Sequence, residues 1–490
     1  MDVSVVIGNI LGQLSYDAAN PLLFSSGLMW VLMLIFIPVY AALKSRRTQM
    51  MVWVVAFSLY FYYKSSGLMF LLLIATSLVD WTLSRVIAAS DSRLWRRVLL
   101  TLSICVSIGV LGYFKYANFA LWNWCAIVGA NFQPLDIILP IGISFYTFKS
   151  ISYVVDVYKG KIAPTELWLE YVFHLSFFPT LLAGPIVRAD CFLPQLRENK
   201  PADRGMVYAG LWLIIVGIIK KAVVADYIAQ YNDLVFDNPG AYTGIESLMG
   251  IIGYTMQIYC DFSGYSDMAI GISSIMGFSL PDNFRLPYQS RNVTEFWRRW
   301  HISLSFWLRD YVYIPLGGNR CGRIRTYVNN LATMLVGGLW HGAAWRFVFW
   351  GGMHGVGLVV HKALKPWLDR IPDTRLVRGV SIALTVIFVG LLWVFFRADS
   401  MGDGVTVIAS VGDGFDLRHF WPFVCERWLW CVMMVLMIAA HSLPERWHKG
   451  AQRWFVATPW IVKLIVFMVV VQLTLQLMSA DVKPFIYFQF

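Results

Sequence analysis

The sequence predicts an all-α integral membrane protein that crosses the bilayer many times. Of its 490 residues, 58% are hydrophobic and only 14% are charged, whereas a typical soluble domain carries about 25% charged residues. The mean hydropathy of +0.60 fits a chain whose main solvent is lipid. Apolar runs approach the roughly 20 residues that a helix needs to cross the hydrocarbon core. We therefore expect one membrane domain over residues 1–490 and no separate soluble domain.

The apolar runs follow one another along most of the chain. They lie at 27–43, 51–63, 67–79, 98–114, 207–226, 331–360, 380–396, 427–442 and 459–479. Several are too short to cross the bilayer unaided, and others run together across glycines. We therefore expect roughly 10 to 13 membrane segments, including re-entrant pieces. The 22 Trp, 23 Tyr and 33 Phe suit packing and anchoring at the membrane interface.

The formal charge of +11 indicates membrane topology rather than nucleic-acid binding. Two basic clusters flank the second and third apolar runs: Lys44, Arg46 and Arg47, then Arg93, Arg96 and Arg97. The positive-inside rule places both clusters in the cytoplasm and the N-terminus outside. The chain opens without a basic region followed by a short apolar core, so we expect no cleaved signal peptide. The seven cysteines are scattered without CxxC or metal-like spacing, so we expect them to be packed and no metal to be bound.

Three polar stretches interrupt the apolar runs, at 185–205, 281–327 and 397–425. We expect the third to be a surface loop, because it contains several glycines and aspartates. In the second stretch, Asn292 or Thr294 can cap a helix that runs to about Tyr311. One face of that helix would carry Trp297, Trp300, His301, Leu304 and Leu308. This pattern indicates an amphipathic helix at the interface or beside a polar cavity, which Pro315, Gly317 and Gly318 would end.

His341 is the histidine that most clearly suggests chemistry. It lies in LVGGLWHGAAW, near the middle of an apolar stretch of about 30 residues, where an ionisable group is costly and indicates function. Gly337, Gly338 and Gly342 leave space for another helix or a substrate chain. A buried neutral imidazole can act as a general base. The alternative is a histidine that only hydrogen-bonds a neighbouring helix.

The other ionisable residues have structural explanations. On a continuous helix His354 would point away from His341, which favours a structural role for His354. Asp261 and Asp267 need partners inside an apolar region, and an arginine such as Arg285 or Arg298 could supply one. We expect His174 to form a hydrogen bond to a neighbouring helix. We expect surface roles for His361, His419, His441 and His448. No Ser-His-Asp motif, P-loop, zinc motif or dinucleotide fingerprint is present.

Several long stretches resemble the membrane-bound O-acyltransferase family, in particular its bacterial alginate O-acetyltransferase-like and D-alanyl transfer protein-like branch. The longest is YCDFSGYSDMAIGISSIMGFSLPDNFRLPYQSRNVTEFWRRWHISLSFWLRDYVYIPLGGNR at 259–320. The others are LPIGISFYTFKSISYVVDVYKG at 139–160, FFPTLLAGPIVRADCFLPQL at 177–196, GGLWHGAAWRFVFWGGMHG at 337–355 and PFIYFQF at 484–490. They occur in the expected order over most of the chain.

The resemblance implies a fold, a reaction and a site. The fold would be a polytopic ring of membrane helices around a central catalytic tunnel. The reaction would move an acyl group from a thioester donor to a hydroxyl, without a bound cofactor or a metal. The family's catalytic histidine corresponds to His341, and its second signature position corresponds to His301. We expect His341 to be the general base and His301 to polarise the thioester carbonyl or position the acceptor.

Five further residues are expected to bind the donor or the acceptor: Arg298, Arg299, Arg309, Trp340 and Asp261. The phosphates of an acyl-CoA could meet these arginines, or Arg320, Arg323 and Arg325, if the segment faces the cytoplasm. The alternative for each arginine is a topological role or contact with lipid headgroups.

The sequence therefore predicts O-acetylation of a cell-surface or secreted polysaccharide such as alginate, from acetyl-CoA or an acyl-carrier thioester. The expected location is the bacterial inner membrane. The expected partners are membrane lipids, an extracytoplasmic acyltransferase and polysaccharide export machinery, with no nucleic acid. Alternatives are transfer of D-alanine or another acyl group to an envelope polymer, a transporter with proton-relay residues, or a non-catalytic scaffold. The absence of repeated halves disfavours the transporter.

Overall fold

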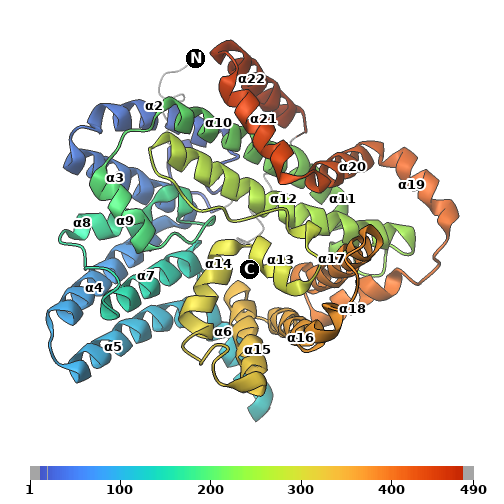
Figure 1. Ribbon diagram of the computed structural model, residues 1–490, viewed down its shortest axis with the longest axis horizontal. Coiled ribbons are helices and arrows are strands. Elements are labelled where there is room, and N and C mark those ends of the chain that lie inside the picture. The colour runs from blue at the N-terminus through green and yellow to red at the C-terminus, as the bar shows by residue number, and fades with distance from the viewer. Residues whose placement is uncertain (1–11, 19, 478–490) are drawn as a thin grey trace. The chain divides into compact units, whose positions relative to one another are not determined.

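The computed structural model describes residues 12–18 and 20–477, and no part of these ranges forms a β-strand (Figure 1). The all-α class predicted from the sequence is thereby confirmed. The chain divides into two compact units, Met1–Leu211 with Met268–Pro281 and Trp212–Asp267 with Asp282–Phe490. The expectation of one membrane domain stays a prediction. The PFIYFQF segment, which carries part of the family resemblance, lies outside the described residues.

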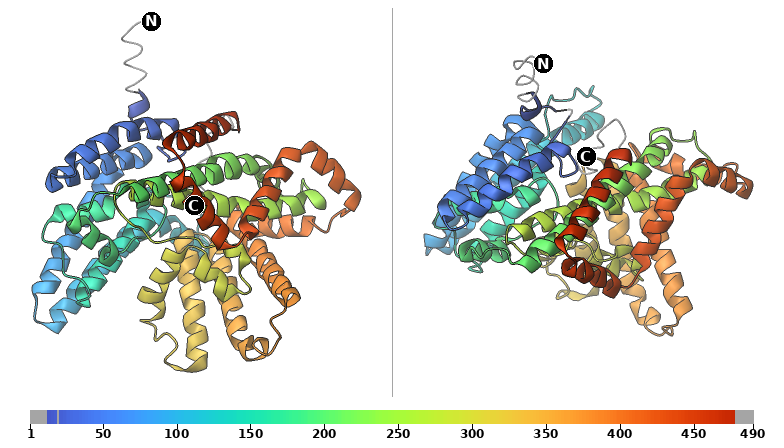
Figure 2. Two further views of the ribbon diagram at one scale, coloured as in Figure 1. Left: turned by 45° about the horizontal axis from the view of Figure 1, so that its top comes forward. Right: turned by 90° about the horizontal axis from the view of Figure 1, so that it is seen from above.

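The first unit is built around helices α4, α5 and α7, which pack against one another (Figures 1 and 2). Its helices are α2 (Gly27–Leu43), α3 (Arg47–Ser66), α4 (Phe70–Ala89), α5 (Arg93–Leu111), α6 (Ala117–Val128), α7 (Ile143–Tyr158), α8 (Trp168–Ser176), α9 (Ala189–Glu198) and the start of α10 (Arg204–Ile218). Asp80 in α4 is buried and accepts hydrogen bonds from Ser103 of α5 and Ser150 of α7. This buried carboxylate links the three helices.

The second unit contains the C-terminal half of the chain. After α10 come the π-helix η4 (Ile219–Ala225), α11 (Asp226–Asp237), α12 (Ile245–Ile275), α13 (Val293–Arg299), α14 (Ile302–Leu308), the π-helix η6 (Arg309–Tyr313), α15 (Gly322–His341), α16 (Trp345–Leu368), α17 (Arg375–Arg397), α18 (Met401–Ser410), α19 (Phe420–Glu426), α20 (Trp428–Ser442), α21 (Glu445–Ala457) and α22 (Trp460–Leu477). The final residues of α12 belong to the first unit.

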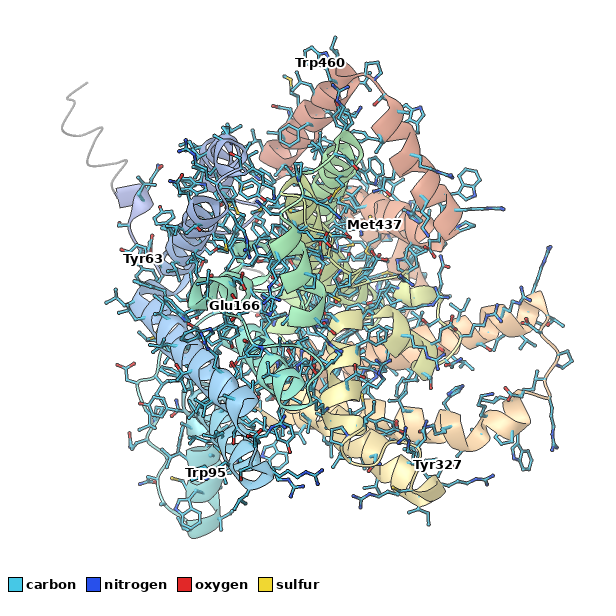
Figure 3. All side chains as sticks on the ribbon, turned by 60° about the vertical axis from the view of Figure 1, so that its left-hand side comes forward. Tyr63, Trp95, Glu166, Tyr327, Met437 and Trp460 are labelled. Atoms are coloured by element: carbon cyan, nitrogen blue, oxygen red, sulfur yellow. The ribbon has the colours of Figure 1, made fainter. Side chains whose placement is uncertain are left out.

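Within residues 12–18 and 20–477, five helical segments are long and apolar enough to cross a membrane, or six if one bent pair is a single span. They are Arg47–Ala89, Arg93–Val128, Arg204–Asp237, Arg375–Arg397 and Trp460–Leu477, with Leu417–Glu426 and Trp428–Ser442 as the bent pair. The other predicted segments would have to come from shorter or less apolar helices. Large apolar side chains project outward, including Trp95 at 62% and Trp460 at 65% exposure, as expected of lipid-facing positions (Figure 3).

Helices α15 and α16 form a tightly packed hairpin (Figure 1). A Cβ at Gly338 would lie 2.2 Å from the backbone oxygen of Phe347, and one at Gly351 would lie 2.4 Å from the backbone oxygen of Met334. Only glycine permits this approach of two backbones. The predicted role of Gly338 in admitting another helix is confirmed, and the other helix is α16.

Two predicted elements are wrong in detail. The helix expected from Asn292 to Tyr311 is split into α13, α14 and η6, because His301 adopts a left-handed backbone conformation with φ 41°. Asn292 does cap the first piece, since its side chain accepts a hydrogen bond from the Glu295 amide.

The stretch 397–425, expected to be a surface loop, contains α18 and α19. Ser400 caps α18 by accepting from the Asp403 amide, a signal that the glycines obscured.

Candidate active site

His341 lies at the last position of α15, directly before the break that separates α15 from α16. The apolar stretch of about 30 residues around His341 therefore forms two helices. The His341 side chain is buried, and its ring packs against Trp340 at 5.0 Å, Trp350 at 4.9 Å and Phe396 at 5.2 Å between centroids. Three aromatic rings thus fix the position of the imidazole in a water-poor environment.

His301 lies at the break between α13 and α14 and is completely buried. Its φ of 41° and ψ of 56° are unusual for a residue with a side chain and commonly mark functional sites. Burial lowers the pKa of His301 to about 3, so the imidazole is neutral at physiological pH. The predicted apolar face is confirmed for its neighbours Trp297, Trp300, Leu304 and Leu308, all of which are buried.

Asn283 determines which nitrogen of His301 carries the proton. The backbone amide and the hydroxyl of Ser303 both donate to Asn283 Oδ1, at 3.3 and 2.9 Å, while Asn283 Nδ2 donates to Ser266 Oγ at 3.1 Å. These contacts fix the orientation of the amide, because a backbone N–H can only donate. His301 Nδ1 lies 3.1 Å from the same Oδ1 and must therefore donate to it. In the neutral ring, Nε2 then carries the lone pair.

Trp340 brings the two histidines into one site. Its ring lies 5.9 Å from that of His301 and 5.0 Å from that of His341, between centroids. The positions are 40 residues apart along the chain, and the packing of α15 beside the broken α13–α14 segment makes them neighbours. The sequence analysis expected Trp340 to bind the donor or the acceptor, and the structure places it between the two imidazoles.

His354 belongs to the same aromatic cluster but is held by a hydrogen bond. Trp297 Nε1 donates to His354 Nδ1 at 3.3 Å, and the His354 ring lies 4.8 Å from that of Trp350. Because α15 and α16 are separate helices, the expectation that His354 points away from His341 on one helix does not apply. Both imidazoles contact Trp350, from different helices. The bond from Trp297 fits a structural role for His354.

Asp261 and Asp267 are paired with lysines, not with the arginines that we expected. Lys221 Nζ lies 2.5 Å from Asp261 and 2.7 Å from Asp226, while Lys220 lies 2.7 Å from Asp267. The side chains of Lys221 and Asp261 are each 4% exposed. The π-helix η4 places these two consecutive lysines against α12, which the sequence did not reveal. The pairing with Lys221 fits a structural anchor, and the expectation that Asp261 binds the donor or the acceptor stays a prediction.

The arginines expected to bind the donor lie on a more exposed part of the same segment. Arg298 is exposed, Arg299 pairs with Glu295 at 2.7 Å, and Arg309 pairs with Asp310 at 2.6 Å. The residues Arg320, Arg323 and Arg325 are also exposed. The structure thus separates a buried histidine pair from an exposed basic segment.

Comparison with known proteins agrees with this geometry. The model of the family described as MBOAT, membrane-bound O-acyltransferase, matches residues 168–400, which include both histidines. A probable alginate O-acetylase of Azotobacter vinelandii is 45% identical over 62% of this chain and 60% of its own length. A peptidoglycan O-acetyltransferase of Helicobacter pylori is 36% identical over 75% of each chain. A probable alginate O-acetylase of Pseudomonas aeruginosa is 39% identical over 78% of this chain and 73% of its own length.

This chain therefore aligns with less than two thirds of the Azotobacter protein and with about three quarters of the other two. The similarity and the long apolar helices together confirm the prediction of a multi-pass membrane protein. The ring of helices around a tunnel stays a prediction. The chain belongs to the membrane-bound O-acyltransferase family.

Proposed function

We propose that this chain is an O-acetyltransferase that serves a cell-surface or secreted polysaccharide such as alginate. The names of the relatives support acetyl transfer, since each describes O-acetylation. The donor in this proposal is a cytoplasmic thioester, either acetyl-CoA or an acetylated carrier. The protein lies in the inner membrane, and an extracytoplasmic acyltransferase and the export machinery complete delivery to the polymer.

The observation that carries the proposal is the pair of buried histidines on either side of Trp340. His341 takes the proton from the acceptor hydroxyl as its oxygen attacks the thioester carbonyl. The carbon–sulfur bond then breaks, the new ester is released and the thiolate receives the proton from His341. The surrounding aromatic rings exclude water that would otherwise hydrolyse the thioester.

His301 fits the role of positioning the acceptor better than that of polarising the carbonyl. Polarisation requires a hydrogen-bond donor aimed at the carbonyl oxygen. With Nδ1–H committed to Asn283, the remaining Nε2 of the neutral ring can accept but not donate. A neighbouring hydroxyl of the acceptor sugar can donate to Nε2 and thereby hold the attacking hydroxyl within reach of His341. Of the two roles expected for His301, we therefore propose acceptor positioning.

The test uses purified protein in nanodiscs with [¹⁴C]acetyl-CoA, mannuronan oligosaccharides and the extracytoplasmic acyltransferase partner. We expect labelled product with the wild type and a loss of about 10²-fold or more with His341→Ala, the range that general bases supply. His419→Ala is the matched control, because His419 is an exposed histidine. Wild-type activity in His341→Ala would overturn the assignment of the base.

The alternatives give different outcomes in the same assay. Turnover of a carrier-linked D-alanyl thioester, but not of acetyl-CoA or an acetylated carrier, would favour D-alanyl transfer. Movement of an oligosaccharide into sealed vesicles without consumption of any thioester would favour a transporter. No thioester consumption and no transport, with partner proteins present, would favour a scaffold.

A further inference from the structure

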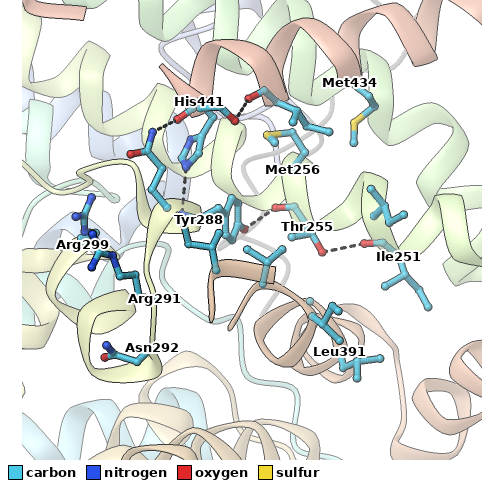
Figure 4. A pocket seen from close by; sticks show the side chains of 18 of the residues that line it. Ile251, Thr255, Met256, Tyr288, Arg291, Asn292, Arg299, Leu391, Met434 and His441 are labelled. Carbon is cyan, nitrogen blue, oxygen red and sulfur yellow. Dashed lines mark hydrogen bonds between the residues drawn. The ribbon is translucent and has the colours of Figure 1, made fainter. Parts of the chain in front are cut away.

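A large cavity of about 1080 Å³ lies in the second unit, and neither His301 nor His341 lines it (Figure 4). Its walls come from α12, α17, α18, α20 and the segment around α13. Most of the lining is apolar and includes Ile251, Met256, Ile387 and Leu391. This volume would hold a substantial amphiphilic molecule.

The cavity is elongated and its two ends differ in polarity. Along α17 its lining runs from Arg378 to Leu391, which corresponds to about 20 Å at the rise of an α-helix. Arg291, Asn292 and Arg299 lie on one side of the view, whereas Ile251 and Leu391 lie on the other (Figure 4). An occupant would therefore have an apolar part at one end and a polar group at the other.

The polar end carries more positive than negative charge. Arg299 pairs with Glu295 at 2.7 Å, while Arg291 and Arg378 share the carboxylate of Asp373, at 3.3 and 2.6 Å. Three guanidinium groups are thus matched by two carboxylates. The side chains of Arg291 and Arg378 are each 46% exposed and can turn toward a ligand. A phosphate group would complement this excess of charge.

His441 supplies an independent indication of a ligand. The Tyr288 backbone amide donates to His441 Nε2 at 3.1 Å, so the neutral ring carries its proton on Nδ1 (Figure 4). His441 is 5% exposed, and its buried Nδ1 has no hydrogen-bond acceptor among residues 12–18 and 20–477. A buried donor without an acceptor is costly. His441 lines the cavity, where a carbonyl or phosphate oxygen of an occupant could accept from it. The expectation of a surface role for His441 was wrong.

We propose that this cavity binds an anionic phospholipid of the surrounding bilayer. Its acyl chains lie along α12 and α17 toward Leu391, and its phosphate lies at Arg291, Arg299 and Arg378. The apolar walls favour a lipid over free phosphate, because a small ion would leave most of the cavity empty. Ile387 and Leu391 are 57% and 40% exposed, so a lipid can enter from the bilayer. Neither of the two histidines proposed for acyl transfer lines this cavity, so the lipid proposal does not depend on the proposed function.

The first test compares two lipids with identical chains on the wild-type protein. Purified full-length protein in detergent is titrated with radiolabelled dioleoylphosphatidylglycerol or dioleoylphosphatidylcholine. We expect saturable binding of about one phosphatidylglycerol per chain, at least about tenfold tighter than phosphatidylcholine, and weakened by salt. Equal binding of the two lipids would overturn the proposal, as would complete displacement of phosphatidylglycerol by 10 mM inorganic phosphate.

Variants then locate the site. Arg291→Gln and Arg378→Gln should each weaken phosphatidylglycerol binding about tenfold, because each removes a charge-assisted contact. Arg375→Gln is the matched control, since Arg375 is exposed on the first turn of α17 and does not line the cavity. Ile387→Trp should block binding by filling the apolar part, whereas Leu384→Trp, on the same helix outside the cavity, should not. Unchanged binding in Arg291→Gln, Arg378→Gln and Ile387→Trp would overturn the assignment to this cavity.

Discussion

Replacing Asn283 tests whether the tautomer of His301 matters for catalysis. In Asn283→Ala, His301 Nδ1 and the Ser303 amide lose the Oδ1 to which they donate at 3.1 and 3.3 Å. A buried donor left without its acceptor costs about 1–3 kcal/mol. In the wild type this energy favours the Nδ1–H tautomer of His301 over the Nε2–H tautomer. Its loss lowers the ratio of the two tautomers by about 5- to 150-fold. We therefore expect kcat to fall by about 10- to 100-fold.

Asn283→Asp separates this role from a merely structural one. A carboxylate at this position can still accept from His301 and Ser303, so the expected loss at neutral pH is small. However, its negative charge favours the imidazolium and raises the pKa of His301 above its wild-type value of about 3. Protonation of Nε2 removes the lone pair that holds the acceptor. As pH falls, the variant should therefore lose activity at a higher pH than the wild type.

The assay is the pH dependence of kcat and of KM for acetyl transfer from [¹⁴C]acetyl-CoA in nanodiscs. Asn232→Ala is the control, because Asn232 is also fully buried and donates one hydrogen bond, to Gln257 at 2.8 Å. It should lower the thermal midpoint without moving the acidic limb of the profile. An acidic limb of Asn283→Asp that coincides with the wild type, or lies at lower pH, would refute the argument.

Two further predictions concern packing and charge. Gly338→Ala should destabilise the protein by about 1–3 kcal/mol, because its Cβ would meet the backbone of α16 at 2.2 Å. Gly109→Ala is the control and should not lower the thermal midpoint, because no atom lies within 4 Å of a Cβ at that position. Lys221→Met should cost about 3–5 kcal/mol by leaving buried Asp261 without this partner. The double variant with Asp261→Asn should recover part of that loss in denaturation assays, and a double variant less stable than Lys221→Met would contradict the pairing.

The membrane class was predictable because it depends on composition and on the length of apolar runs. Both quantities can be read directly from the sequence. In lipid, each backbone N–H and C=O group must form its hydrogen bond within its own helix, so a long apolar run predicts a helix. Helix breaks were less predictable. The split at His301 depends on contacts from Asn283, 18 residues earlier, and on the burial of the surrounding rings. Periodicity alone favoured one continuous helix over this segment, since nothing in its local composition demands a left-handed residue.

The sequence by itself determined the membrane character and the family resemblance, and through them it singled out the two histidines that we propose for the chemistry. Only the tertiary structure decided that Trp340 joins them, that Lys221 rather than an arginine neutralises Asp261, and that His441 faces a cavity. The physical reason is the range of the interactions. Hydropathy and helix capping depend on residues that are near neighbours in the chain. The hydrogen bond that sets the His301 tautomer, the ion pair that neutralises Asp261 and the ring contacts of Trp340 join residues that are far apart in the chain.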